Sequence, residues 1–127
     1  MSGGTVLLAL ALFQLKHYLA DFQWQSAWMV QTKGRYGHLG GVAHAGLHGA
    51  LSLPVLLLVA PSMPLLIALL VLGEVVLHYH VDWLKSRLSV GAGIDQNDSA
   101  YWHLLGLDQA AHQLTYLAIV AMLVMLG

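Results

Sequence analysis

Four stretches of this 127-residue sequence are long and apolar enough to cross a lipid bilayer as helices. A helix needs about 20 mostly apolar residues to span the hydrocarbon core, so this feature limits the fold more than any other. We predict an all-α, polytopic membrane protein, with four transmembrane helices bundled into a single domain over residues 1–127. The predicted spans cover residues 5–22, 42–60, 64–84 and 104–126.

The composition excludes several other classes of protein. Apolar residues make up 58% of the chain and Asp, Glu, Lys and Arg only 9%, whereas soluble domains are about 25% charged. Intrinsic disorder requires low hydrophobicity and high charge, so it is excluded too. The formal net charge of −1 gives no sign of a nucleic-acid partner, and the absence of Cys rules out disulfide scaffolds and thiolate metal sites.

The positively charged residues indicate an orientation for the four spans. Lys16 lies near the end of the first span, Lys33 and Arg35 follow it, and Lys85 and Arg87 follow the third span. Loops that are rich in Lys and Arg remain in the cytoplasm. We therefore predict that both longer loops are cytoplasmic and that both termini lie outside the cytoplasm.

Each predicted span carries two His or Asp residues that are four positions apart. This spacing places both side chains on one helix face, and the predicted topology places all four pairs in the cytoplasmic half of the membrane. Ionisable groups are costly inside a membrane and usually mark function. We predict that the four pairs form a metal site. Its ligands would be His17, Asp21, His44, His48, His78, Asp82, Asp108 and His112.

The ligand types narrow the metal and suggest accessory groups. Imidazole and carboxylate without sulfur suit divalent zinc, iron or manganese, and we expect zinc first. Eight ligands exceed one tetrahedral ion, so either two ions bind or some of the residues support the ligands of one ion. Glu74 is a candidate catalytic base or proton relay, or else a neutral buried acid. Lys85 could hold an anionic substrate group, or else anchor the helix at the surface.

The four pairs belong to longer motifs that occur in a fixed order. These are H-x-x-x-D-F-x-x-Q from His17, H-x-x-x-H from His44, H-x-x-x-D-x-x-K from His78 and D-Q-x-x-H from Asp108. In this combination the sequence resembles the small bacterial inner-membrane proteins grouped as domain of unknown function 3307 (DUF3307). The similarity covers nearly the whole chain. It implies a four-span, multi-pass protein of the bacterial inner (cell) membrane and adds little about a reaction.

The function that these features favour is metal-dependent hydrolysis of a lipid-like, lipid-linked or otherwise amphipathic substrate, although the residues leave open whether the chain is an enzyme. The nucleophile would be a metal-bound water. The alternatives are a di-iron oxidative enzyme, a non-enzymatic protein that binds or transports metal ions or protons, and a haem-binding subunit of a larger membrane complex. The expected partners are membrane lipids, and either a second copy of the chain or a larger complex.

Overall fold

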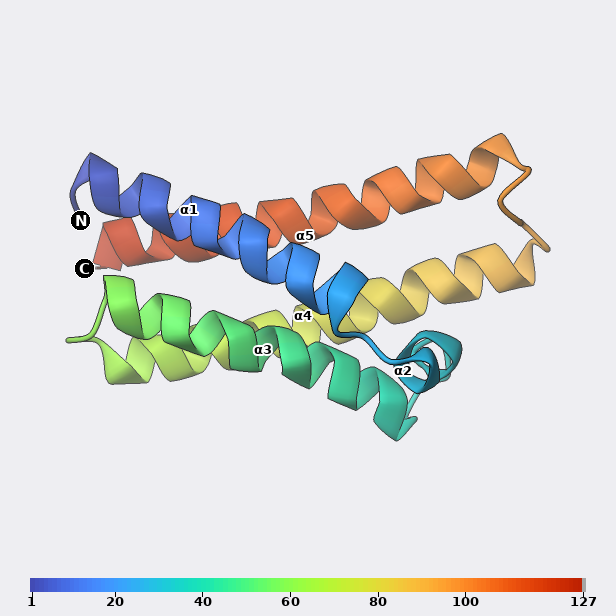
Figure 1. Ribbon diagram of the computed structural model, residues 1–127, viewed down its shortest axis with the longest axis horizontal. Helices are drawn as coiled ribbons and strands as arrows, with labels where there is room; N and C mark the ends of the chain where they lie inside the picture. The colour runs from blue at the N-terminus through green and yellow to red at the C-terminus, as the bar shows by residue number, and fades with distance from the viewer. Residues whose placement is uncertain (127) are drawn as a thin grey trace.

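The structure, a computed structural model, describes residues 1–126, and its regular elements there are all helices. The long helices lie lengthwise in a bundle, and the short α2 lies at one end of it (Figure 1). In chain order the elements are α1 (Gly3–Tyr18), a π-helical segment (Leu19–Gln23), α2 (Ala27–Thr32), α3 (Leu39–Val59), α4 (Pro64–Gly91) and α5 (Ser99–Leu126).

Four helices are long and apolar enough to cross a membrane, which confirms that part of the sequence prediction. They are α1 with its π-helical continuation, α3, α4 and α5. Two of these helices extend beyond the predicted spans, because α4 continues to Gly91 and α5 begins at Ser99. Apolarity marks only the part of a helix that could lie in lipid, whereas backbone geometry determines where the helix ends. After α4 the chain turns at Gly93, whose φ of +63° favours glycine.

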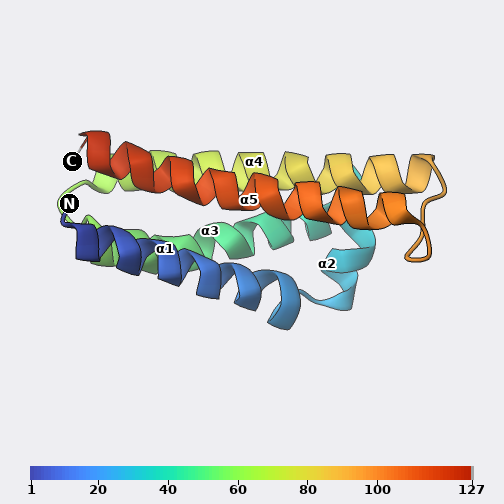
Figure 2. The ribbon, with the colours of Figure 1, turned by 90° about the horizontal axis from the view of Figure 1, so that it is seen from above.

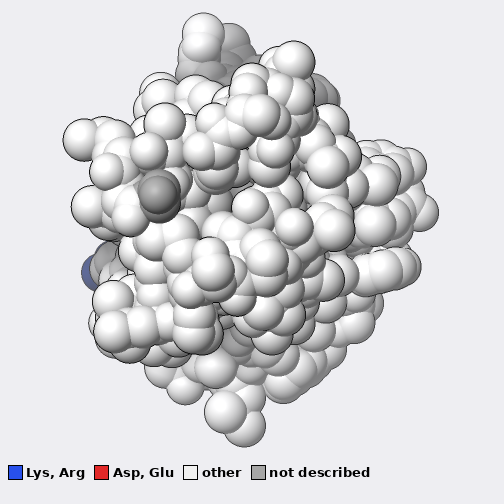
Figure 3. Space-filling view, turned by 90° about the vertical axis from the view of Figure 1, so that its left-hand side faces the viewer, with Lys and Arg blue, Asp and Glu red and all other residues white. Residues whose placement is uncertain are grey.

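The two ends of the bundle differ in charge. Both termini and the turn between α3 and α4 lie at one end, and α2 and the loop between α4 and α5 lie at the other (Figures 1 and 2). The end that carries the termini presents almost no Lys, Arg, Asp or Glu (Figure 3). The charged loops therefore share one end of the molecule.

The interior of the bundle has an apolar half and a polar half. The apolar core fills the half nearest the termini and reaches as far as Tyr116, whose ring stacks on Phe13 with the centroids 5.2 Å apart. The buried polar residues occupy the other half. Only 22% to 39% of the residues in the four apolar windows are buried, so most apolar side chains face outward.

Close packing of α3 on α4 brings two of the predicted ligands together. A Cβ atom on Gly49 would lie 2.5 Å from the Cγ2 atom of Val75, so only glycine allows this approach. Small residues have the same role at many helix interfaces in membranes. Next to this contact, the imidazole rings of His48 and His78 lie with their centroids 3.6 Å apart.

Candidate metal centre

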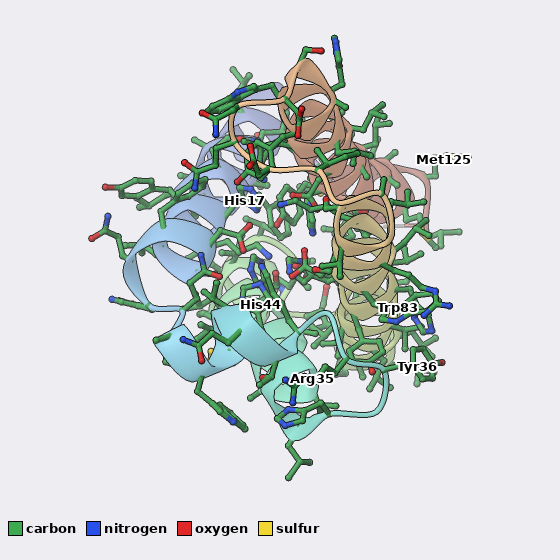
Figure 4. The ribbon with its side chains drawn as sticks, turned by 90° about the vertical axis from the view of Figure 1, so that its right-hand side faces the viewer. His17, Arg35, Tyr36, His44, Trp83 and Met125 are labelled. Carbon is green, nitrogen blue, oxygen red and sulfur yellow. The ribbon has the colours of Figure 1, made fainter. Side chains whose placement is uncertain are left out.

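All eight predicted ligands are buried in the polar half of the bundle, with relative exposures of 0% to 7%. They come from α1, the π-helical segment, α3, α4 and α5. Seen from the loop end, His17 and His44 point into the space between the helices (Figure 4). The shared helix faces that the i, i+4 spacing predicts are therefore all turned inward.

The first group of candidate ligands consists of Asp21, His44, His48 and His78. One donor atom from each residue lies within 4.8 Å of the corresponding atoms of the other three. The Oδ1 atom of Asp21 lies 3.0 Å from Nε2 of His44 and 3.2 Å from Nε2 of His48. Three imidazole nitrogens and one carboxylate oxygen form a donor set that a divalent metal ion accepts.

The second group consists of His78, Asp82 and His112, so the two groups share His78. Asp82 connects them further, because its Oδ2 atom lies 3.0 Å from Nε2 of His44 and 3.6 Å from Nε2 of His78. The groups thus form one continuous cluster, which could hold a single ion or two adjacent ions.

Several nitrogens in this cluster lack a hydrogen-bond partner. Within residues 1–126, neither ring nitrogen of His78 has a partner, and neither does Nε2 of His112. The Nδ1 atom of His112 donates to the backbone oxygen of Asp108 at 2.7 Å, so the Nε2 lone pair is free. A buried polar atom without a partner costs about 1–3 kcal/mol. A cation would satisfy these lone pairs, so the donor set fits a metal ion.

His17 lies beside the cluster but in neither group, and both of its ring nitrogens have hydrogen-bond partners. Its Nδ1 atom accepts from the Tyr116 hydroxyl at 3.0 Å, and its Nε2 atom donates to the Oε1 atom of Gln109 at 2.9 Å. The Nε2 atom also lies 3.3 Å from the Oδ2 atom of Asp21. His17 therefore contacts the carboxylate of Asp21, and its predicted role as a direct ligand remains a prediction.

Asp108 is also outside both groups. Its Oδ2 atom accepts from Nζ of Lys85 and from Nε2 of Gln109, each at 3.2 Å. The structure thus brings six of the eight predicted ligands into the two groups and places His17 and Asp108 around them. It also uses Lys85 as the ion-pair partner of Asp108, with 23% of the Lys85 side chain exposed.

Glu74 forms a buried ion pair with Lys16 one helical turn below the cluster. The Lys16 ammonium lies 3.4 Å from Nδ1 of His48 and 4.3 Å from the centroid of the Tyr116 ring. The second carboxylate oxygen of Glu74, Oε2, has no hydrogen-bond partner within residues 1–126. The sequence places Lys16 among the cytoplasmic positive charges, whereas the structure buries it inside the bundle, where it pairs with Glu74.

Lys33 is a second site residue whose role the sequence did not reveal. Its ammonium lies 3.0 Å from Oδ2 of Asp82 and 3.4 Å from Nε2 of His44. It also donates to the side chain of Gln25, which in turn donates to the backbone oxygen of Asp21. Lys33 therefore covers the cluster at the loop end, where 15% of its side chain is exposed.

The remaining three histidines, His38, His80 and His103, lie outside the two groups of candidate ligands. His38 caps the start of α3 by accepting from the backbone N–H of Gly40. His80 faces away from the interior and lies 3.3 Å from the Tyr36 hydroxyl. His103 is exposed in the first turns of α5.

Fold and site together define a class of protein. It is a helical protein with four helices able to cross a membrane and a buried His/Asp cluster that could hold a metal ion. The chain belongs to the family described as "Protein of unknown function (DUF3307)", which matches residues 8–127. This match confirms the family resemblance that the four motifs indicated. No curated protein and no solved structure matches the chain.

Proposed function

We propose that this protein is a membrane-embedded metalloprotein and that its centre catalyses metal-dependent hydrolysis of an amphipathic substrate. The observation that carries the proposal is the cluster of buried donor atoms, with free lone pairs on His78 and His112. Burial of so many unpartnered nitrogens would be unfavourable unless they bind something. A bound divalent ion would supply a Lewis acid that activates water near neutral pH.

The surrounding side chains have supporting roles in this proposal. Asp21, His44, His48 and His78 would hold an ion, and Asp82 and His112 would complete its coordination or hold a second ion. His17 and Asp108 orient these ligands. The free oxygen of Glu74 would accept or return a proton, and Lys33 and Lys85 would attract an anionic substrate group at the loop end.

Exposed apolar residues support the membrane location. Leu7, Leu58, Leu65 and Leu114 are between 63% and 73% exposed on different long helices. So large an apolar surface is suited to lipid rather than to water. We further propose that the membrane is the bacterial inner membrane and that both termini lie outside the cytoplasm.

The absence of Cys from the chain allows a direct test of this orientation. In intact cells, a membrane-impermeant maleimide should label a Ser2→Cys variant, whereas an Asn97→Cys variant should react only after the cells are permeabilised. The reverse pattern would overturn the proposed orientation. Labelling of both variants in intact cells would overturn the membrane topology itself.

The apolar half of the interior favours a centre that binds and reacts over a transport pathway. Ser52, Glu74 and Tyr116 mark the inner limit of the polar half. Between these residues and the termini, all buried residues in the described part of the chain are apolar. Ions would meet this layer before they reached the other end of the bundle. We therefore rank hydrolysis above transport through a single chain.

Elemental analysis of the protein, purified without added metal, tests the proposal. We expect near-stoichiometric zinc, iron or manganese in the wild type and its loss in a His48→Ala variant. His80→Ala is the matched control, because His80 is exposed and lies outside the cluster, so this variant should keep the metal. A folded wild type that holds no metal, or a His48→Ala variant that retains it fully, would overturn the metal centre.

The reaction itself requires a separate measurement. Metal-loaded and metal-stripped protein should be compared on detergent-solubilised phosphate and carboxylate esters with long alkyl chains. Turnover that depends on metal would support hydrolysis. Metal binding without such turnover would indicate a metal-binding protein and would refute the proposed hydrolase activity. Iron content with oxygen-dependent absorbance, or a haem absorption band, would favour the redox alternatives instead.

A further inference from the structure

We propose that a cleft at the loop end of the molecule binds the phosphate group of an anionic lipid through Arg35 and Arg87. The cleft has a volume of about 870 Å³ and lies between α2, with the loop that follows it, and the last turns of α4. It is lined by residues that are not part of the metal cluster. Phosphate binding there does not depend on the function proposed for that cluster.

In the described part of the chain three carboxylates pair with lysines and leave both arginines without an acidic partner, although Arg87 lies over the Trp83 ring, with its Cζ atom 5.9 Å from the ring centroid. The three lysines each pair with a carboxylate, on Glu74, Asp82 or Asp108. Within residues 1–126, neither arginine forms an ion pair with Asp or Glu, and both line the same cleft. A guanidinium group presents parallel N–H donors that match two phosphate oxygens, so two free arginines in one cleft favour a phosphate ligand.

The apolar lining of the cleft points to a lipid rather than to free phosphate. Val30, Leu88 and Val90 line the cleft beside the arginines, and all three are exposed. An inorganic phosphate ion would gain nothing from these side chains, whereas the glycerol and acyl groups of a lipid would cover them. The cleft also lies at the end of the bundle that we place at the cytoplasmic headgroup level.

Packing between the two walls makes the cleft a formed feature of the fold. A Cβ atom on Gly34 would lie 2.7 Å from the Cβ atom of Ser86, so the loop and α4 are in close contact at this point. The ring of Tyr36 packs on Trp83 with the centroids 5.1 Å apart. In Figure 4, Arg35, Tyr36 and Trp83 lie on the same side of the loop end. The segment that carries Arg35 is thus fixed against α4, which reduces the entropy lost when a ligand binds.

A smaller groove between α4 and α5 shares one lining residue with the cleft and reaches Asp108 beside the metal cluster. Leu88 lines both the cleft and a smaller space of about 230 Å³ between α4 and α5. Leu84, Leu104 and Leu107 line this groove, and Asp108 lies in its wall. An acyl chain could therefore follow α4 toward the centre. That connection rests on the function proposed above, whereas the phosphate site does not.

The test is calorimetric titration of the purified protein in non-ionic detergent with dioctanoyl phosphatidic acid. We expect saturable binding, weakened at least about tenfold by Arg35→Gln or by Arg87→Gln, because each removes charged hydrogen bonds. Dioctanoyl phosphatidylcholine, which has the same chains but no net charge, should bind far more weakly. Inorganic phosphate should also bind more weakly, because it makes no apolar contact.

Two sets of variants separate the role of the arginine side chains from that of the metal cluster. Arg35→Lys and Arg87→Lys keep the charge and lose the forked donors, so they should bind with intermediate affinity. The His48→Ala variant should bind the lipid as the wild type does, even if it holds no metal. Both arginines are exposed, so the variants should fold, which circular dichroism can check.

Three results would overturn the proposal. Binding that is unchanged by the Gln variants would show that the arginines do not hold the ligand. Inorganic phosphate that binds as tightly as phosphatidic acid would exclude a lipid site. Loss of lipid binding in the His48→Ala variant would place the ligand at the metal cluster instead.

Discussion

Replacement of His78 by Leu should have opposite effects on metal binding and on the stability of the metal-free protein. His78 belongs to both candidate groups, and its two ring nitrogens have no partner within residues 1–126. Leu has a similar volume and no polar atoms. The variant therefore removes the shared ligand without opening a large cavity beside His48, whose ring lies 3.6 Å away.

The loss of metal affinity in His78→Leu can be estimated from the number of donor atoms in the first group. Structural zinc sites bind with about 10–16 kcal/mol, so each of four donors contributes roughly 2.5–4 kcal/mol. Each 1.4 kcal/mol is a factor of ten in affinity, so His78→Leu should weaken metal binding by about 10²–10³-fold. Without metal, replacing buried unpartnered nitrogens by apolar atoms of similar shape should be neutral or stabilising.

Thermal unfolding in detergent, with and without added metal, measures both effects. At a metal concentration of 100 times the dissociation constant, the wild type should gain about 2.7 kcal/mol, and the variant should gain almost nothing. His80→Leu, an exposed position on the same helix, should behave as the wild type in both conditions. If His78→Leu binds metal within about fivefold of the wild type, or destabilises the metal-free protein by several kcal/mol, His78 is a packing residue and the reasoning fails.

Three further changes test the surroundings of the cluster. Lys16→Met should lower the free energy of unfolding by about 3–5 kcal/mol, because it leaves the buried Glu74 carboxylate unpaired. Adding Glu74→Met should recover most of this loss in denaturant titrations. A double variant that recovers no stability would contradict the pairing. Gly49→Ala should lower the free energy of unfolding by about 1–3 kcal/mol through overpacking. Gly46 has open space around it, so Gly46→Ala should be neutral or stabilising. Equal thermal midpoints of the two variants would contradict the close contact of α3 with α4. Asp108→Asn should weaken metal binding by about 10–100-fold, which is less than the loss of a direct ligand would cause. A larger loss of affinity in a metal-competition assay would show that Asp108 is itself a ligand.

Much of the fold and the shared direction of the site residues could be predicted from the sequence. A single apolar stretch of this length can cross a membrane only as a helix, because a helix satisfies its backbone hydrogen bonds internally. The helical period then fixes that His44 and His48, or His78 and Asp82, share one face. Their common depth follows from the alternating direction of the spans. These inferences need only local geometry and the order of the elements.

The roles of individual residues were harder to predict, because partners from other helices determine them. His17 has the same spacing to Asp21 as a metal-binding pair, but Tyr116 and Gln109 of α5 engage its nitrogens. Nothing in the local sequence of α1 shows how α5 is rotated against it. The same holds for Lys33, whose contact with the cluster depends on the fold of the first loop.

The burial of Lys16 could have been predicted from the spacing of residues in the sequence. Ala9, Phe13, Lys16 and Ala20 follow a helical spacing, and all four are buried. A Lys on the same face as buried apolar residues has to find a carboxylate inside the bundle. Glu74 is the acid deepest in the third predicted span, so the two could have been paired. We find no comparable pattern in the sequence for the π-helical segment that carries Asp21.

The charge of the buried cluster favours one divalent ion over two. Four carboxylates and three ammonium groups meet in this half of the bundle and leave one net negative charge, with the histidines neutral. One divalent ion would change the net charge to one positive, which a single anionic group such as a phosphodiester would neutralise. Two ions would leave three positive charges in a medium of low dielectric constant, where uncompensated charge is costly. We therefore expect one metal ion per chain at saturation, and a measured ratio of two would contradict this charge balance.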